Sequence, residues 1–314
     1  MQFFDSLAAV PADFGPSAVA IGKFDGVHSG HRAVIAALGD AAHEGGLTAT
    51  IVTFDRHPLS LLRPEACPEP LLSNAQKVER LAETGVDATL MVEFDRPFSQ
   101  LSPEEFVRGI LVDALHARLV FVGSDFRFGA RGAGTVELLT ELGATAGFEV
   151  RLIDDVVATG ERRASSTWVR ELLAEGRVVE ATAVLGHEPS IRSVVVHGVQ
   201  RGRELGYPTA NLSPAIEGYI PADGVYAAWL TVGGVKHGAA VSIGNNPTFE
   251  GVPEKQVEAH VLDANLDLYD ATVELSFVEY IRGMRKFSGM EALAEQMSLD
   301  EQQIRGILGY PPRA

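Results

Sequence analysis

Two histidines stand among three glycines in the stretch "IGKFDGVHSGH", residues 21–31. His28 and His31 are three positions apart, where a strand-like apolar run gives way to a helical pattern. If a helix begins near Gly30, both imidazoles lie at its first turn, beside free backbone N–H groups and the positive end of the helix dipole. Gly26 carries no side chain, so a bulky anion can approach the backbone closely. The pattern therefore has three interpretations: a phosphate site, a metal site, or ordinary helix capping and core packing.

The metal interpretation lacks ligands. A site of this kind needs a third protein ligand, and no other His or Cys cluster lies nearby in the sequence. Cys67 is the only cysteine, which excludes an internal disulfide and a thiolate cluster. Two imidazoles can instead donate hydrogen bonds to phosphate oxygens, which suits a transfer at phosphorus. On these residues alone, a phosphate site and a structural role both stay open.

A second group of phosphate-binding side chains follows in "RRASSTWVREL", residues 162–172. Ser166 and Thr167 offer hydroxyl and N–H groups at the start of a predicted helix, and Arg170 lies one turn further on. The alternative for Arg170 is a solvent-facing surface arginine. The pattern predicts a second anion-binding helix N-terminus.

Neutral oxygens and arginines mark the stretch "RGRELGYPTANL", residues 201–212. Thr209 and Asn211 alternate onto one face of an extended segment and offer hydroxyl and amide oxygens. Such oxygens suit a Mg²⁺ that keeps waters and substrate phosphates as its other ligands. Arg201 and Arg203 form a short basic loop suited to covering a triphosphate. The sequence contains no G-x-x-x-x-G-K-[ST] motif, so we do not expect a P-loop.

Alternating strands and helices position the first of these groups. Strand-like runs occur at 18–22, 47–54, 88–94, 118–123 and 148–153, and helical patterns at 30–44, 73–84 and 102–116. Ser102 and Glu105 form a capping box at the start of the last helix. This order predicts a parallel α/β sheet covered on both faces, with ligands beyond the carboxyl ends of its strands. The first histidine lies just there.

The pattern of the sequence changes after Gly186. Short β-type runs separated by Gly, Pro, Asn and Asp occupy 191–198, 224–232, 236–244, 257–263 and 271–282, and an amphipathic helix covers about 288–308. Gly233 and Gly234 predict a hairpin turn. This pattern indicates a small antiparallel β-barrel with a terminal helix. Residues 166–185 are helical with a break near Gly176, and we expect domains at 1–186 and 187–314.

Composition agrees with a two-domain protein that handles small ligands. The chain has 314 residues, 46% of them hydrophobic and 22% charged, with a net charge of −16. The two expected domains are both acidic, so no nucleic-acid partner is expected. No apolar run is long enough for a membrane helix, and the first residues lack the basic region of a secretory signal, so we expect a cytoplasmic protein without a membrane partner.

Several motifs in order resemble one enzyme family. "GKFDGVHSGH" resembles the HxGH signature of the nucleotidylyltransferase superfamily, in the form typical of prokaryotic FAD synthetases. "TFDRHP" at 53–58, "FVGSDFRFGARGAG" at 121–134 and the serine–threonine stretch follow in the expected order. The Pro-Thr-Ala-Asn run resembles riboflavin kinases, as do "PADGVY" at 221–226, "NPTF" at 246–249 and "VEAHVLD" at 257–263. The resemblance spans roughly residues 17 to 309.

The resemblance implies a bifunctional riboflavin kinase/FMN adenylyltransferase. A Rossmann-like N-terminal domain would adenylylate FMN with ATP to give FAD and pyrophosphate, and a C-terminal barrel would phosphorylate riboflavin to FMN with ATP and Mg²⁺. Two alternatives are a chain in which only one half is active, and a flavin-binding regulatory or storage protein with decayed catalysis. Riboflavin, FMN, FAD and ATP are the expected small-molecule partners.

The resemblance also assigns roles to individual residues. His28 and His31 would bind and neutralise phosphates without forming a covalent adduct, and Glu258 would be the base of the kinase. ATP and phosphate contacts are expected from Gly22, Phe24, Gly30, Arg163, Ser166, Thr167, Arg170, Arg201 and Arg203. Flavin contacts are expected from His57, Asp125, Phe126 and Phe128, and metal contacts from Thr209 and Asn211. For the two phenylalanines and for His57, packing and turn formation are the alternatives.

Four positions depart from the family pattern. Arg56 stands where a proline is usual, Thr135 where an aspartate is common, His187 where an arginine is usual, and Ser193 where a glycine is usual. A missing glycine can forbid a backbone conformation that a loop requires, so Ser193 bears on the kinase half.

Overall fold

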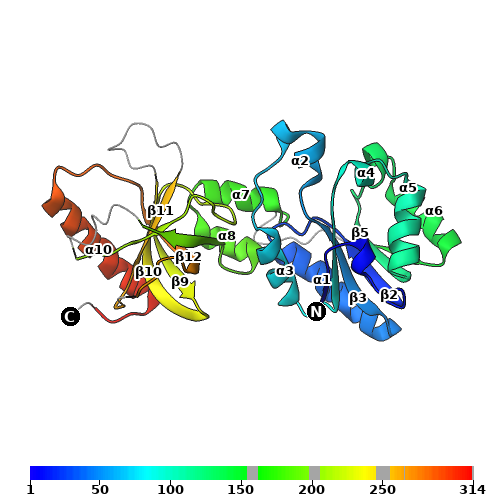
Figure 1. The fold of residues 1–314 in the computed structure, drawn as a ribbon, viewed down its shortest axis with the longest axis horizontal. Coiled ribbons are helices and arrows are strands. Elements are labelled where there is room, and N and C mark those ends of the chain that lie inside the picture. Colours follow the sequence, from blue (N-terminus) through cyan, green and yellow to red (C-terminus); the bar gives the residue numbers. More distant parts are fainter. Residues whose placement is uncertain (154–161, 198–205, 245–254, 265, 313–314) are drawn as a thin grey trace. The chain divides into compact units, whose positions relative to one another are not determined.

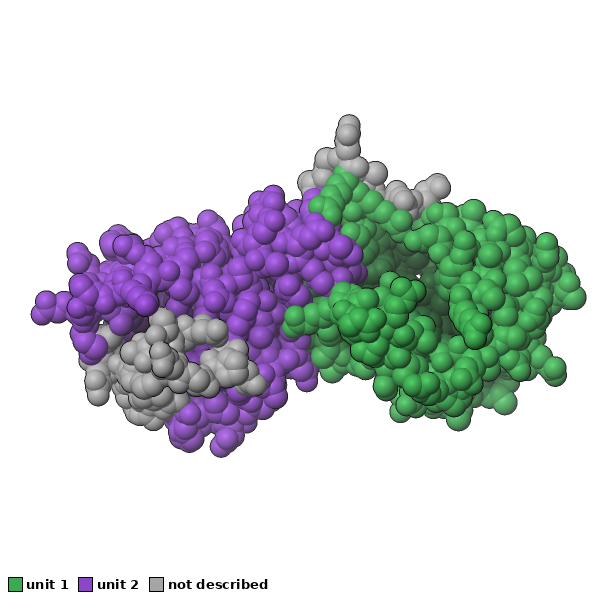
Figure 2. All heavy atoms as spheres, turned by 90° about the horizontal axis from the view of Figure 1, so that it is seen from above, with its two compact units in different colours: residues 1–165 green, residues 166–314 purple. Residues whose placement is uncertain are grey.

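The chain folds into two compact units, residues 1–165 and 166–314. The structure is a computed structural model that describes residues 1–153, 162–197, 206–244, 255–264 and 266–312 (Figure 1). Figure 2 shows the first unit in green and the second in purple. The division falls earlier than the expected boundary after Gly186, because two helices that precede that residue pack within the second unit.

A parallel sheet forms the centre of the first unit. Among the described residues its six strands lie in the order β1-β4-β3-β2-β5-β6, and each neighbouring pair is parallel. The strands are β1 Gln2–Phe4, β2 Ser17–Ile21, β3 Thr48–Phe54, β4 Ala88–Val92, β5 Ala117–Gly123 and β6 Glu149–Ile153. The predicted parallel sheet is confirmed. The short edge strand β1 was not predicted, because three residues carry too little pattern to be recognised.

Helices follow the strands of this sheet. They are α1 Ser29–Gly45, α2 Pro58–Leu62, α3 Asn74–Ala82, α4 Arg96–Ser99, α5 Pro103–Phe106 with its π-helical continuation η3 Val107–Ala114, and α6 Val136–Ala146. The capping box is confirmed, since the Glu105 N–H donates to Ser102 Oγ at 3.1 Å and the Ser102 N–H donates to Glu105 Oε2 at 2.8 Å. None of the described helices has both the length and the apolar character needed to cross a membrane.

Burial follows strand position in the sheet. Every residue of the inner strands β2 and β4 is buried, whereas the edge strand β6 is largely exposed. A parallel strand covered on both faces needs apolar side chains on both sides, which explains the unbroken apolar runs in the sequence. The chain order reverses at β2, which has β3 on one side and β5 on the other. This is the switch point at which ligands bind in open α/β sheets.

The second unit begins with two helices that belong to its core. α7 spans Ser166–Ala174 and α8 spans Val178–Leu185, and the predicted break lies at Gly176 in the left-handed region, with φ of 75°. The Ala222 N–H donates to the Leu173 carbonyl at 2.9 Å, which ties the end of α7 to the segment that leads into β9 (Gly224–Val232). These contacts explain why the second compact unit starts at Ser166.

A closed antiparallel barrel forms the rest of this unit. Its described strands are β7 Ser190–Val196, β8 Ala210–Leu212, β9 Gly224–Val232, β10 Val235–Gly244, β11 Gln256–Val261 and β12 Thr272–Arg282, in the order β10-β11-β8-β7-β12-β9. The hairpin between β9 and β10 turns at Gly233 and Gly234, whose φ angles of 56° and 80° suit glycine. The terminal helix α10, Met290–Leu308, is anchored by Arg282, which donates to both carboxylate oxygens of Asp300. The barrel and its helix confirm the prediction.

Candidate active sites

Loops at the carboxyl edge of the parallel sheet bring the N-terminal candidates together. His28 follows β2, His57 follows β3, and Asp125 follows β5. Since β2 lies between β3 and β5, these loops meet at the switch point of the sheet. The structure thus brings the loops of His28, His57 and Asp125 to one edge of the sheet, and the roles of these residues stay predictions.

The two histidines form one stacked unit at the start of α1. His28 is the N-cap of the helix, and its Nδ1 accepts a hydrogen bond from the His31 backbone N–H at 3.3 Å. The two rings stack with 3.6 Å between centroids and 18° between planes. Because Nδ1 of His28 accepts, its ring proton lies on Nε2 when the ring is neutral. His28 therefore caps α1, and its contact with phosphate stays a prediction.

His31 is held neutral by its surroundings. Burial lowers its pKa well below the ordinary value of 6.5, and the neighbouring His28, Lys23, Arg163 and Lys77 lower it further. Its Nδ1 is buried and has no hydrogen-bond partner among the described residues. Burial and the neighbouring positive charges therefore favour the neutral ring of His31, and its binding of phosphate stays a prediction.

Two of the glycines lie tightly against aromatic rings. A Cβ on Gly30 would lie 3.2 Å from the His28 ring, and one on Gly22 would lie 3.1 Å from the ring of Phe24. Phe24 is 2% exposed and packs with its ring centroid 5.0 Å from that of His31. Gly22, Phe24 and Gly30 therefore pack beneath the rings of the two histidines. Their direct contact with phosphate stays a prediction.

The expected arginine and hydroxyl contacts fall in both units. Arg163 belongs to the first unit, and its charge acts on His31. Ser166, Thr167 and Arg170 lie in the first turns of α7, in the second unit. Their joint action with the histidines stays a prediction from the sequence.

The residues expected on the flavin side differ in burial. His57 caps α2 by accepting the Leu59 N–H at 3.1 Å, and Asp125 is exposed in the loop after β5. Phe128 is 5% exposed and belongs to the hydrophobic core, where it packs 5.3 Å from Phe106. Phe126 stacks on Phe128 at 5.6 Å and is only partly buried. Packing thus accounts for Phe128, whereas Phe126, Asp125 and His57 are placed where a ligand can reach the loops.

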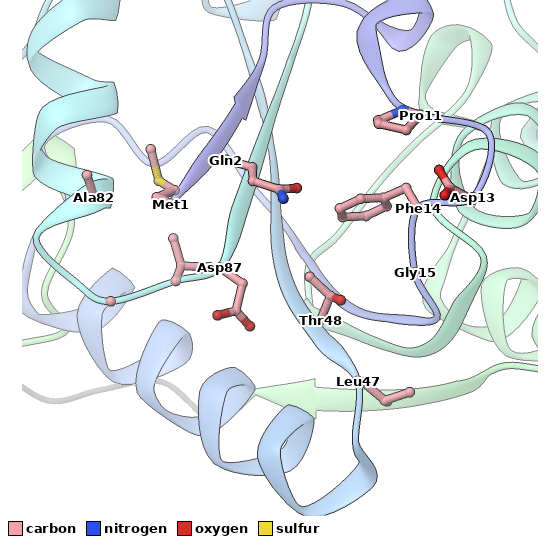
Figure 3. A pocket seen from close by; sticks show the side chains of 12 residues that line it. Met1, Gln2, Pro11, Asp13, Phe14, Gly15, Leu47, Thr48, Ala82 and Asp87 are labelled. Carbon is pink, nitrogen blue, oxygen red and sulfur yellow. The ribbon is translucent and has the colours of Figure 1, made fainter.

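A separate pocket lies at the opposite edge of the same sheet (Figure 3). Its volume is about 720 Å³, and its lining includes Gln2 at the start of β1, Thr48 at the start of β3 and Asp87 just before β4. These residues mark the amino ends of the strands. None of the predicted site residues lines it.

The barrel candidates gather on two neighbouring strands. Asn211 of β8 lies directly opposite Glu258 of β11 in the antiparallel register. Thr209 Oγ1 donates to Glu258 Oε2 at 3.4 Å, and Asn211 Nδ2 donates to the Thr209 carbonyl at 3.4 Å. Val257 and Ala259 are buried in the barrel, so Glu258 and its partners lie on the outer face. The predicted trio of Thr209, Asn211 and Glu258 is therefore one cluster.

Glu258 lies in a partly buried position beside the Thr209 hydroxyl. Partial burial raises the pKa of its carboxyl above the ordinary value, and the smaller effect of the Thr209 hydroxyl lowers it. A carboxylate with a raised pKa is a stronger proton acceptor. The side-chain oxygens of Thr209 and Asn211 beside it form a donor set of oxygen alone, the set that a hard cation such as Mg²⁺ prefers.

Several expected residues lie outside the part that the structure describes. Arg201 and Arg203 are in the segment 198–205, and the "NPTF" run is in the segment 245–254. The ATP contacts expected of Arg201 and Arg203 stay predictions.

The departures from the family pattern are accommodated. Thr135 is the N-cap of α6 and accepts the Leu138 N–H at 3.3 Å, so a threonine replaces the usual aspartate in the same role. Ser193 lies in β7, in register with Val273 of β12, and its hydroxyl donates to the Ser213 carbonyl at 3.0 Å. Arg56 forms a close ion pair with Asp55, 2.6 Å between nitrogen and oxygen. The extended strand at Ser193 does not need glycine.

One buried residue near the histidines was missed by sequence reasoning. Lys77 in α3 is 7% exposed, and its Nζ donates to the Phe54 carbonyl at 2.7 Å. Lysine is rarely buried without a specific role. The available signal was its spacing, since Lys77 lies four residues before the buried Leu81 and thus on the inner face of α3.

Comparisons with known proteins match this geometry. The FAD synthetase family model matches residues 10–168, and the riboflavin kinase family model matches residues 185–308. A bifunctional riboflavin kinase/FMN adenylyltransferase of Listeria monocytogenes is 38% identical over 92% of this chain and 91% of its own length. The protein of the same name from Escherichia coli K12 is 37% identical over 92% of each chain.

A solved structure is similar along the whole chain. It is described as a macrolide-efflux protein from Streptococcus pneumoniae, with a TM-score of 0.84, 31% identity, and coverage of 96% of this chain and 98% of its own. Both compact units therefore have counterparts in one known fold. With two family matches and relatives above 30% identity over nine-tenths of their length, the chain belongs to the family of bifunctional riboflavin kinase/FMN adenylyltransferases.

Proposed function

We propose that this chain makes FMN and then FAD. The second unit phosphorylates riboflavin with ATP, and the first unit adenylylates FMN with a second ATP and releases pyrophosphate. The two family matches support both activities, as do relatives named for both. The observation that carries the proposal furthest is the cluster in which Asn211 faces Glu258 and Thr209 donates to the same carboxylate. Decayed catalysis is not favoured, because these groups are all present.

The kinase step uses Glu258 as its base. The carboxylate accepts the proton of the ribityl 5′-hydroxyl while that oxygen attacks the γ-phosphorus of ATP, and ADP leaves with the bridging oxygen. The raised pKa of Glu258 favours this proton transfer. Arg201 and Arg203 cover the triphosphate.

Thr209 and Asn211 would hold Mg²⁺ through their side-chain oxygens. When bound, the cation offsets the negative charge of the ATP phosphates. The oxygen-only donor set fits this ion. The hydroxyl of Thr209 also orients the carboxylate of Glu258, so Thr209 serves both the ion and the base.

The adenylylation step uses the stacked histidines. A phosphate oxygen of FMN attacks the α-phosphorus of ATP, the bond to the oxygen between the α- and β-phosphorus breaks, and pyrophosphate leaves. His28 donates its Nε2–H to the charged oxygens, and His31 binds the phosphates as a neutral ring, without a covalent adduct. Arg163, Ser166, Thr167 and Arg170 complete the phosphate contacts, while Gly22, Phe24 and Gly30 pack beneath the rings of the two histidines.

The flavin of FMN is bound by the loops after β3 and β5. His57 and Asp125 supply polar contacts, and the partly buried ring of Phe126 supplies an apolar one. Phe128 supports Phe126 from the core. The proposal includes no nucleic-acid or membrane partner, and the lone cysteine supports a cytoplasmic location.

The test is turnover with separated products. The purified chain is incubated with riboflavin, ATP and Mg²⁺, and the flavins are separated by chromatography. FMN followed by FAD is expected. FMN without FAD would overturn the adenylylation, the absence of FMN would overturn the kinase, and tight flavin binding without turnover would favour a storage protein.

A further inference from the structure

The loop that presents His28 is strained. Phe24, Gly26 and Val27 have φ angles of 48°, 85° and 41°, all in the left-handed region. Valine is a rare occupant of that region because its branched side chain crowds the backbone. Such conformations persist only where the surrounding structure imposes them, and they are found most often at functional sites. Phe24 and Val27 are both buried, which supplies part of the support.

Polar contacts from two neighbouring segments also support the strained loop. The Thr53 hydroxyl donates to the Lys23 carbonyl at 3.0 Å, and the Leu71 N–H donates to Asp25 Oδ1 at 2.8 Å. The first contact ties the loop to β3, and the second ties it to the segment that leads into α3. The strained loop is therefore held on both flanks.

Lys77, in α3, contacts the end of β3, the strand that supports the loop. Its Nζ donates to the carbonyl of Phe54, the last residue of β3, at 2.7 Å. Its buried ammonium is attracted by the carboxylates of Asp25 and Asp55, which offset part of the cost of its burial. Asp25 belongs to the strained loop, so Lys77 acts on the end of β3 and on the loop at once.

We propose that Lys77 is a positioning residue for FMN adenylylation, acting through the end of β3, and through its attraction to Asp25, to hold the strained loop that sets His28 and His31. The inference rests on the proposed function of the first unit. Lys77 does not touch the reacting atoms. It fixes the backbone that carries the two imidazoles, and small displacements of positioned groups cost large factors in rate.

The experiment compares Lys77→Met with a matched variant, Arg80→Met. Arg80 lies on the same helix, where its side chain pairs with Glu83, and its replacement removes the same charge. Each variant is assayed for FMN to FAD and, as an internal control, for riboflavin to FMN. We expect Lys77→Met to lower kcat for FAD formation about 100-fold, with kcat/KM falling equally, since positioning matters most in the transition state. Arg80→Met should stay within about twofold, and FMN formation should be unchanged in both.

A spectroscopic readout separates positioning from loss of fold. Lys77 is one of the positive groups that lower the pKa of His31, together with His28, Lys23 and Arg163, so its removal should raise that pKa. The His31 ring resonance, assigned with a His31→Gln variant, should titrate at higher pH in Lys77→Met and not in Arg80→Met. A His31 ring resonance with the same chemical shift in Lys77→Met as in the wild-type chain would mean that the ring is not displaced, and would overturn the proposal.

Asp25→Asn serves if Lys77→Met does not fold. The asparagine oxygen keeps the acceptor for the Leu71 N–H and removes only the charge that faces Lys77. It should also lower FAD formation, and the double variant should lose little more than Lys77→Met alone. Normal FAD formation in either single variant, or additive losses in the double variant, would overturn the role of Lys77. A wild-type chain that makes no FAD would instead overturn the proposed function.

Discussion

The two candidate sites of this chain are built in opposite ways. In the barrel, the register of β8 and β11 alone sets Asn211 opposite Glu258. In the parallel sheet, the histidines lie at the start of α1, directly after a loop with left-handed residues that other segments and a buried lysine must support. Strand register fixes side chains through regular backbone hydrogen bonds, whereas a loop site depends on contacts scattered along the sequence. The barrel site should therefore tolerate distant changes better than the histidine site.

The largest expected effect is on the barrel side. Glu258→Gln removes the proposed base while keeping the shape and the acceptor for the Thr209 hydroxyl. We expect FMN formation to fall about 10²–10⁴-fold, the usual contribution of a general base. FAD formation from supplied FMN should be unchanged, and chromatography of both reactions measures the pair of rates. Equal losses in both reactions would mean that the two sites are not independent.

His28→Ala is the counterpart in the loop site. It removes both the helix cap and the Nε2–H donor, so FAD formation should fall about 10²–10³-fold, the usual cost of one lost donor to a charged transition state. FMN formation from riboflavin should survive. A loss of FMN formation with the fold intact, as checked by circular dichroism, would contradict the assignment of activities. Asn211→Ala should show the reverse pattern when FMN is supplied.

A single methyl group tests how sensitive the loop site is. Gly30→Ala places a Cβ 3.2 Å from the His28 ring, which must shift by a few tenths of an ångström. FAD formation should fall about tenfold, because catalysis depends on the placement of that ring. Gly39→Ala is the matched control on the same helix, since a Cβ there meets nothing within 4 Å. Equal activity of the two variants would remove the proposed sensitivity.

The smallest expected difference lies in the pH profiles of the two reactions. Burial raises the pKa of Glu258, so its carboxylate is lost as pH falls through a value above the ordinary 4.5, and FMN formation should decline there. The pKa of His31 lies well below 6.5, so His31 stays neutral and should give FAD formation no acid limb near that value. The rates of FMN and FAD formation, each measured from about pH 5 to 8, would compare the two pH profiles. An acid limb of FAD formation near 6.5 that vanishes in His31→Gln would contradict this account.

Most of the fold could be predicted from the periodicity of apolar residues, and most of the candidate site residues could be named from motifs. A parallel sheet covered on both faces needs strands that are apolar on both sides. The alternation of strands and helices around residues 18–123 could therefore be recognised from the sequence alone. The cluster of Thr209, Asn211 and Glu258 was also predictable, because family motifs marked each member.

Roles that arise only from packing were not predictable. Gly30 was expected to contact phosphate, and the structure shows it packed against the His28 ring. For Phe128, flavin contact and packing were both open, and its ring lies in the core. Lys77 gave no motif at all, since its importance comes from Phe54 and Asp25, more than twenty residues away in the sequence. Tertiary contacts of this kind leave no local pattern.

The attachment of α7 and α8 to the barrel determines where the chain can be cut to produce the second unit alone. The Leu173 carbonyl accepts the Ala222 N–H, and a Cβ on Gly176 would meet the ring of Tyr280 at 3.0 Å, so the helical turn covers barrel side chains. A shortened chain that starts at 187 would strip this cover and leave aromatic surface in water. One that starts at 166 keeps it, and is the better choice for isolating the flavin-phosphorylating half.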